Sequence, residues 1–415
     1  MSALGVLRRP QFRRGFLASS ASALGNNIAT VAVAFAILAI GHSAVELGLV
    51  LAARLVPLAV LSIVGGAWAD RLPRRSIMVA SDLVRLATQG GFALVLLLPE
   101  PSLAAIVALQ FVNGAATAFF QPAAAGLVQE IVPPEERQSA WALLSASANI
   151  SSIIGPGIGA ALIAFAGNAW ALGVDALSFG LSALFLIGVV VPPRVPDERR
   201  GLLREIAEGV REVTRRRWVG LEILSFSLFQ FFALAAYGVL GPLVAERRYD
   251  GATTWALIAG LGGVGAVAGD LVALRIRPTR PVAVSNLVMI ASLPLLVGLA
   301  LGAPLWLLLV AGVLWGFALS LADTLWLTTL QQHVPPNLMA RVSSLDWMGS
   351  LALRPIGVAL LPLLAAGIGA PAVLIAVAAV TLVTTVGPGL LPVVLRVRAA
   401  PDPPDEPAGP EQRIA

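Results

Sequence analysis

The sequence predicts an all-α membrane protein in which twelve helices cross the bilayer, and three observations support this fold class. The chain is 58% hydrophobic and only 12% charged, about half the charged fraction of an average soluble protein. Its apolar residues form blocks of roughly 20 residues or more, the length at which a helix spans a hydrocarbon core of about 30 Å. Arginines collect between these blocks, mainly in alternate connecting segments.

The apolar blocks form two groups of six, separated by a polar segment. They predict membrane helices at 16–40, 46–68, 76–98, 102–128, 139–165, 168–191, 219–245, 252–274, 281–301, 303–330, 342–366 and 370–395. The polar segment carries apolar side chains at helical spacing from Leu203 to Val213, and Glu212 and Arg216 lie four residues apart on its polar side. This pattern predicts an amphipathic helix on the membrane surface.

These blocks divide the chain into four parts. We predict a six-helix half at 1–191, a cytoplasmic linker at 192–218, a second six-helix half at 219–395 and a disordered cytoplasmic tail at 396–415, which is rich in Pro, Asp and Glu. The halves share an internal repeat, since QEIVPPEER at 129–137 recurs as QQHVPPNLM at 331–339. Many secondary carriers are built from such repeats, with the substrate site between the halves. We therefore expect two pseudo-symmetric halves.

The distribution of arginine predicts the orientation. All 28 basic residues are Arg, and 23 of them precede the first span, follow an even-numbered span or lie in the linker and tail. The positive-inside rule then places both termini in the cytoplasm. Exclusive use of Arg indicates a GC-rich bacterial genome, so we expect a multi-pass protein of a bacterial inner or plasma membrane. The basic charge is a topology signal and does not predict nucleic-acid binding.

The sequence also excludes several classes of chemistry. It contains no cysteine, which removes disulfides, thiolate catalysis and cysteine metal sites. It contains no P-loop, so ATP-driven transport by this chain alone is not expected. We predict no catalytic, cofactor-binding or metal-binding residues. The expected partners are a small-molecule substrate and the lipid bilayer, and the chain is expected to be a monomer.

The connection between the second and third spans carries the most specific motif. Residues 65–75 read GGAWADRLPRR and resemble the signature G-x-L-A-D-R-x-G-R-K of the major facilitator superfamily; Gly66, Ala69, Asp70, Arg71, Arg74 and Arg75 match it. Trp68 and Pro73 depart from it, and the proline resembles the subgroup of macrolide-efflux and enterobactin-export proteins. The resemblance implies a twelve-helix carrier working by alternating access. It also implies a cytoplasmic gate of the motif charges with Glu130, an acid at the end of the fourth span.

A second resemblance lies in the fifth span. SSIIGPGIGAA at 151–161 is similar to the GlyPro motif of drug–proton antiporters. Gly155, Gly157 and Gly159 allow close approach of a neighbouring helix, and Pro156 permits a bend. In that family the motif accompanies export. The antiporter arginine of the fourth span is absent from LQFVNG at 109–114, so its proton-coupling role has no counterpart there.

Ionisable residues inside the spans are the candidate substrate and proton groups, because such groups are costly in a membrane and usually face a cavity. We select Arg54, Asp175, Asp323 and Arg354; a buried pair that holds helices together is an equally weighted alternative for each. Asp82 and Arg85 are expected to pair with each other. Three further acids are expected to lie in solvent near the cytoplasmic surface: Glu222, Asp270 and Asp346.

Polar and aromatic residues complete the candidate site. A stripe on one face of the fourth span predicts cavity lining, with helix packing as the alternative; it consists of Gln110, Asn113, Thr117 and Gln121. Further groups are suited to a large amphipathic solute, with lipid contact as the alternative; they are Phe226, Gln230, Tyr237, Trp315 and Trp326. The resulting hypothesis is a secondary active transporter that exports drugs or amphipathic natural products, macrolide- or siderophore-like, using the proton gradient and no cofactor. The alternatives are an importer of a small polar metabolite and a transport-dead membrane sensor or scaffold.

Overall fold

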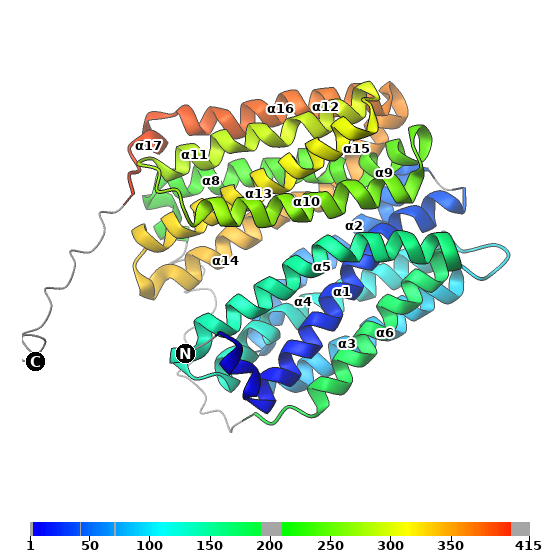
Figure 1. Cartoon of the computed structure of the whole chain (residues 1–415), viewed down its shortest axis with the longest axis horizontal. Helices are drawn as coiled ribbons and strands as arrows, with labels where there is room; N and C mark the ends of the chain where they lie inside the picture. Colours follow the sequence, from blue (N-terminus) through cyan, green and yellow to red (C-terminus); the bar gives the residue numbers. More distant parts are fainter. Residues whose placement is uncertain (1–2, 42, 70–71, 192–209, 400–415) are drawn as a thin grey trace, which may run out of the picture.

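The computed structural model describes residues 3–41, 43–69, 72–191 and 210–399, and every regular element in these ranges is a helix. Two bundles lie side by side in Figure 1, one built from the blue-to-green helices and one from the green-to-red helices. The first bundle consists of η1 (Ala3–Arg8), α1 (Pro10–Ala39), α2 (Ala44–Ala69), α3 (Arg74–Val95), α4 (Leu103–Ile131), η2 (Pro134–Glu136), α5 (Arg137–Ala166) and α6 (Asn168–Ile187).

The second bundle also has six long helical segments, three of which are interrupted. Its elements are α8 (Arg217–Phe229), η3 (Gln230–Leu234), α9 (Ala235–Arg248), α10 (Gly251–Ala273), α11 (Pro281–Val288), η4 (Met289–Ser292), α12 (Leu293–Leu301), α13 (Leu305–His333), α14 (Pro336–Ala352), α15 (Arg354–Ile368), α16 (Ala370–Leu390) and α17 (Pro392–Leu395). The seventh segment contains the π-helical turn η3, the ninth contains the 3₁₀ turn η4, and the eleventh breaks at Leu353 between α14 and α15. The predicted all-α fold with two six-helix halves is confirmed.

Ten helices of the described chain are long and apolar enough to cross a membrane. The other two predicted spans fall short for visible reasons. The helix α3 carries Asp82 and Arg85 in its middle, which lowers its hydropathy, and the break at Leu353 leaves α15 with 15 residues. The break also places Arg354 at the first turn of a helix inside the bundle.

Equivalent helices of the two halves pack through glycine. A Cβ on Gly114 of α4 would lie 2.0 Å from the carbonyl oxygen of Arg54 in α2, and one on Gly316 of α13 would lie 1.7 Å from that of Gly262 in α10. The second and fourth spans therefore approach each other as the eighth and tenth do. This correspondence supports the pseudo-symmetry predicted from the repeat.

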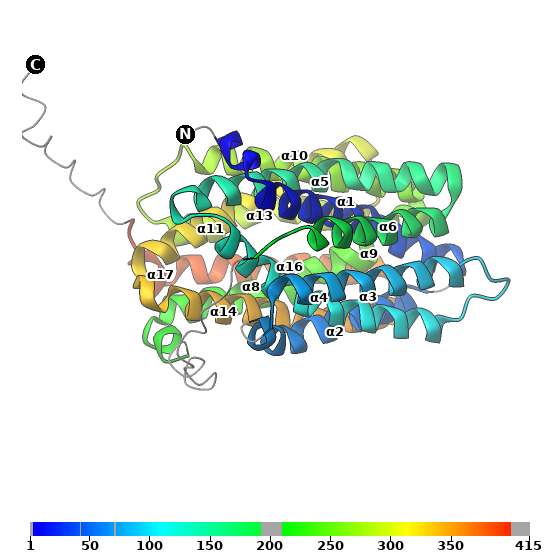
Figure 2. The ribbon, with the colours of Figure 1, turned by 90° about the horizontal axis from the view of Figure 1, so that it is seen from below.

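The two halves meet through α2 with α15 and through α5 with α10. A Cβ on Gly48, near the start of α2, would lie 2.5 Å from the carbonyl oxygen of Val358 in α15. In the second contact, Gly263 of α10 packs against Ile153 of α5. The elements η1 and α17 lie at one end of the molecule, left in Figures 1 and 2; we call this the terminal end. Gly48 lies toward the opposite end, so the halves are joined there.

Two predicted parts fall largely outside the described residues. They are the linker up to residue 209 and the tail from residue 400. In the described end of the linker, the Arg216 Nε donates a hydrogen bond of 2.5 Å to the Glu212 carboxylate, which confirms the pairing expected four residues apart.

Candidate functional site

A central cavity of about 630 Å³ lies between the two halves. Its walls come mainly from α1, α2, α4 and α5, and α9 and α15 contribute from the second half. Arg54 and Arg354 lie at its deep part, and Val128, Trp141 and Leu144 line it near the terminal end, where α4 ends and α5 begins. The cavity is therefore on the terminal-end side of the Gly48 contact that joins the halves.

The charged side chains that line this cavity are all basic. They are Arg54, Arg85 and Arg354, and no Asp or Glu occurs among the described residues of the lining. Serine, threonine and amide side chains supply the remaining polar surface, among them Ser22, Asn26 and Thr30 of α1. The cavity is thus a cationic chamber with neutral polar and apolar walls.

The charge of Arg85 is compensated by an acid of its own helix, while its buried Nε lacks a hydrogen-bond partner in the described part of the chain. Arg85 is 2% exposed and forms an ion pair with Asp82, as predicted, while Ser182 of α6 donates a 2.6 Å hydrogen bond to the same carboxylate. Its guanidinium also lies 4.0 Å and 4.3 Å from the ring centroids of Phe120 and Phe179. This contact favours a cation over an aromatic face. Arg85 therefore joins α3, α4 and α6.

Arg54 has weaker compensation. Its Nη2 donates a 2.9 Å hydrogen bond to the neutral Asn26 Oδ1, and Asp175 of α6 lies within electrostatic range. Asp175 is 1% exposed and does not belong to the cavity lining, and its Oδ1 has no hydrogen-bond partner. The structure thus places the predicted Asp175 behind Arg54, as a buried counter-charge rather than a cavity group.

The polar stripe of α4 has two roles. Gln110, Thr117 and Gln121 line the central cavity, whereas Asn113 does not. Asn113 instead donates a 3.1 Å hydrogen bond to Thr88 of α3, and Gln110 donates one of 3.2 Å to Gln89. The prediction of cavity lining was wrong for Asn113, because the same helix face that reaches the cavity also packs on α3.

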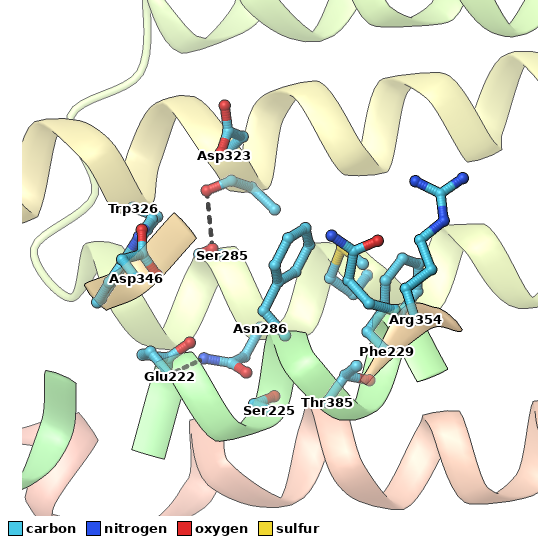
Figure 3. A pocket seen from close by; sticks show the side chains of 14 residues that line it. Glu222, Ser225, Phe229, Ser285, Asn286, Asp323, Trp326, Asp346, Arg354 and Thr385 are labelled. Atoms are coloured by element: carbon cyan, nitrogen blue, oxygen red, sulfur yellow. Dashed lines mark hydrogen bonds between the residues drawn. The ribbon is translucent and has the colours of Figure 1, made fainter. Parts of the chain in front are cut away.

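A second cavity of about 300 Å³ lies within the C-terminal half and contains the acids of the site. Glu222 of α8, Asp323 of α13 and Asp346 of α14 line it, together with Arg354. Figure 3 shows Arg354 across the cavity from Asp346. Glu222 and Asp346 had been expected in solvent; they lie here because α8 and α14 face α13 in three dimensions.

The carboxylates of this cavity form an electrostatic series. Glu222 interacts with Asp346, Asp346 with Asp323, and Asp323 with Asp270 of α10. Neutral donors hold two members of the series: the Asn286 amide donates a hydrogen bond of 2.6 Å to Glu222, and the Trp326 indole donates one of 3.0 Å to Asp346. Three acids therefore line one cavity together with a single basic side chain, Arg354, among the described residues of its lining.

Asp270 ties this series to the other half. Its carboxylate accepts hydrogen bonds of 2.5 Å from Ser320 and 3.1 Å from Thr324, both on α13. Its second oxygen accepts a longer one of 3.5 Å from Asn149 of α5. Asp270, which is half-buried, is thus held by three side chains on two helices.

The aromatic candidates separate into two groups. Phe226, Gln230 and Trp326 line the second cavity, and Gln230 belongs to the π-helical turn η3, a feature frequent at functional sites. Tyr237 and Trp315 stack on each other at 4.8 Å between ring centroids and line neither cavity. These two residues therefore form core packing, contrary to the predicted solute contact.

The gate motif is described in part. Asp70 and Arg71 lie outside the described residues, and Gly66 lies in the last turns of α2. Arg74 at the start of α3 lies 3.4 Å from the Glu130 carboxylate at the end of α4. Arg75 donates a 2.6 Å hydrogen bond to the carbonyl oxygen of Ile187, at the end of α6. These contacts tie three helix ends together at the terminal end.

The GlyPro motif packs α5 on α1. A Cβ on Gly155 would lie 2.4 Å from the Asn27 side chain, and one on Gly159 would lie 2.9 Å from the carbonyl oxygen of Ile28. Pro156 is buried inside α5. Gly157 has no neighbour within 4 Å of its Cβ position, so the close approach predicted for it is wrong. Positions 155 and 159 share one face of the helix, and position 157 points away.

No group of three or more His, Asp or Glu side chains with metal-site geometry occurs in the described part of the chain. The arrangement is a cationic chamber between two halves, an acidic cavity beside it, and Arg354 lining both. Sequence reasoning missed Glu222, Asp346 and Asn286. An acid in an apolar segment was the available signal for the two carboxylates, and Pro355, in the first turn of α15, was the signal for the break at Leu353.

Comparison with known proteins gives the family. The chain is 29% identical over 358 residues to a protein of Shigella boydii serotype 18 named enterobactin exporter EntS, covering 85% of this chain and 84% of that protein. A protein of the same name from Escherichia coli O127:H6 matches at 29% over 361 residues, with coverage of 85% and 84%.

Solved structures share the fold. A bacterial homologue of the human lysosomal transporter Spinster, inward-facing and unoccupied, has a TM-score of 0.74 at 16% identity over 94% of this chain and 98% of that one. The nucleoside transporter NupG has a TM-score of 0.72 at 12% identity over 91% and 98%. The sequence model described as Major Facilitator Superfamily matches residues 15–352. The chain therefore belongs to the Major Facilitator Superfamily and is a multi-pass membrane transporter of that kind.

Proposed function

We propose that this chain is a proton-coupled exporter that moves an amphipathic natural product or drug through the central cavity by alternating access. One observation carries the proposal: Arg354 lines both the central cavity and the acidic cavity. A solute in the first and a proton in the second therefore act on the same guanidinium. The curated relatives named enterobactin exporters support export and a siderophore-like solute.

The coupling follows from the charge around Arg354. We propose that a proton gained or lost by the acidic cavity changes the charge beside Arg354, and thereby changes how strongly Arg354 holds a solute in the central cavity. Binding of solute and binding of proton are then linked, and such linkage is reciprocal. Asp323 is the proposed carrier of the exchanged proton, with Glu222 and Asp346 as its neighbours in the series.

Proton coupling is tested in proteoliposomes that contain a pH-sensitive dye. An imposed pH gradient should drive solute movement by the wild-type protein, and solute should move protons in return. Asp323→Asn should remove both effects while solute still exchanges down its own gradient. The matched control is Glu100→Gln, an exposed acid in the connection between α3 and α4. Full gradient dependence in Asp323→Asn, Glu222→Gln and Asp346→Asn alike would reject proton exchange at this cavity.

We also propose that the protein is a monomer in a bacterial inner or plasma membrane, with the terminal end in the cytoplasm. The excess of arginine at that end supports this orientation. Because the chain has no cysteine, single cysteines test it directly. In whole cells a membrane-impermeant maleimide should label Glu100→Cys at once and Glu135→Cys only after permeabilisation. The reverse pattern would invert the orientation.

A further inference from the structure

We propose that the solute of the central cavity is an organic anion, held between Arg54 of α2 and Arg354 of α15, one arginine from each half. This inference rests on the proposed function only for the claim that the bound solute is transported. Among the solutes proposed above, it favours an acid-bearing, siderophore-like compound over a solute that carries a positive charge.

The lining leaves two positive charges without a full partner. Arg85 is already paired with Asp82. Arg54 contacts the neutral Asn26, and its counter-charge Asp175 lies outside the lining.

Arg354 is the less satisfied of the two. Its Nε has no hydrogen-bond partner, and the charge it interacts with is that of Arg54. Two like charges that face one cavity and lack a carboxylate in its described lining are stabilised by an anion that enters it.

The chemistry of guanidinium narrows the ligand further. Arginine binds planar acid groups with paired hydrogen bonds, which gives a carboxylate or a similar acid an advantage over a neutral solute. The rest of the lining is largely apolar and includes Leu51, Leu55 and Phe120. The volume of about 630 Å³ lies in the range of sites for drug-sized ligands. The ligand class is thus an amphipathic organic acid.

The position of the two arginines also gives the anion a mechanical role. Arg54 and Arg354 belong to different halves, so an anion between them replaces repulsion across the cavity by attraction to both sides. Bound anion therefore favours closure of the cavity around it, whereas a cation adds to the repulsion. Arg54 and Arg354 would then both select the solute and draw the two halves together when it binds.

The charge of the cavity is measured without knowing the natural solute. Ala148 lines the cavity, and Ala148→Cys would be the only thiol in the chain. Its reaction rates with anionic sulfonatoethyl and cationic trimethylammonioethyl methanethiosulfonate are compared, each relative to 2-mercaptoethanol. We expect a preference for the anion of about tenfold or more, as for a cleft lined by one sign of charge.

Arg54→Gln and Arg354→Gln should each reduce this preference several-fold. Arg247→Gln, an exposed arginine at the opposite end, is the matched control and should not change it. Equal rates for the two reagents, or faster reaction of the cation, would overturn the inference. Arg354→Lys keeps the charge and should preserve the preference, which separates a charge effect from misfolding.

Ligand binding is then read from protection of Ala148→Cys. The probes are 1-naphthoate, its neutral isostere 1-naphthamide and the cation 1-naphthylmethylammonium. Protection by naphthoate at concentrations about tenfold below the other two, lost in Arg54→Gln, supports the anion site. Equal protection by the amide, stronger protection by the ammonium, or none by naphthoate contradicts it. If a proton gradient drives transport of neutral or cationic solutes only, the proposed exporter function stands and the anion site is rejected. If protection is anion-selective but no gradient-driven transport is found, the anion site stands and the proposed exporter function is rejected.

Discussion

The guanidinium of Arg74 lies directly over Gly126, so that a Cβ on this glycine would stand 2.1 Å from the Arg74 Cζ. Arg74 reaches Glu130 one turn further along the same helix. The glycine thus provides the space in which the motif arginine crosses α4. We predict that Gly126→Ala displaces Arg74 from Glu130 and lowers the transport rate about as much as Arg74→Gln does.

Gly157→Ala is the matched control, because its added methyl group meets nothing within 4 Å. Transport is measured in proteoliposomes at equal protein content, and thermal unfolding is measured on the same samples. Adding Arg74→Ser to Gly126→Ala should relieve the clash and restore the melting temperature, but not transport. Normal transport by Gly126→Ala would show that the Arg74 contact has no part in gating.

The buried ion pair of α3 predicts a stability effect that depends on which partner is removed. Asp82 and Arg85 are 0% and 2% exposed. Asp82→Asn leaves Arg85 charged and unpaired, which costs about 3–5 kcal/mol for a buried pair. Asp82→Asn should therefore lower the melting temperature strongly, and Asp82→Asn with Arg85→Met should recover much of it. The measurement is thermal unfolding in detergent; a double variant as unstable as the single one would contradict the explanation.

The features that sequence reasoning predicted correctly are those set by local rules. Span length and hydropathy gave twelve segments, because each segment must bury its own backbone in the bilayer. The spacing of Asp82 and Arg85 gave their pairing, because residues three apart on a helix are neighbours. These inferences need only the sequence around each residue.

The features it missed depend on how helices meet. Glu222 and Asp346 were expected in solvent because each lies close in sequence to the predicted cytoplasmic end of its span. In the structure, α8 and α14 bring both acids to one cavity. Asn113 and Gln110 follow the same stripe, but only Gln110 reaches the central cavity. The rotation of each helix against its neighbours decides these outcomes, and a single sequence does not contain it.

Alanine substitutions at the glycines of the second–fourth and eighth–tenth helix contacts should change the melting temperature in the opposite direction to one at Gly173, whose Cβ position is open. Gly114→Ala and Gly316→Ala each place a methyl group about 2 Å from a backbone carbonyl of the partner helix, so each should lower the melting temperature. Gly173→Ala of α6 meets nothing within 4 Å and should raise it slightly, because alanine is favoured over glycine in a helix by up to about 1 kcal/mol. Thermal unfolding of the three variants checks the order. A stable Gly114→Ala would mean that α2 and α4 separate easily.

The ion pair between Arg9 and Glu136 predicts a pH dependence that can be isolated, because it lies outside the spans. Arg9 donates to both carboxylate oxygens of Glu136, at 2.6 Å and 3.1 Å, and so fixes the start of α1 to the connection between α4 and α5. The hydrogen bond from Arg9 lowers the pKa of the Glu136 carboxyl below its usual value. A carboxyl whose pKa is lower in the folded chain than in the unfolded chain stabilises the fold. This stabilisation is present at pH values above the pKa of the unfolded chain, which is about 4.3 for Glu.

The melting temperature of Glu136→Gln should therefore be lower than that of the wild type at pH 7. The difference should shrink as the pH falls through the lowered pKa of Glu136, and it should also shrink at high salt, because the pair is exposed. Glu100→Gln, an exposed acid with no hydrogen bond in the described chain, should show no difference at either pH. A gap between Glu136→Gln and wild type that persists at pH 3 would mean that the carboxylate charge is not what holds α1 in place.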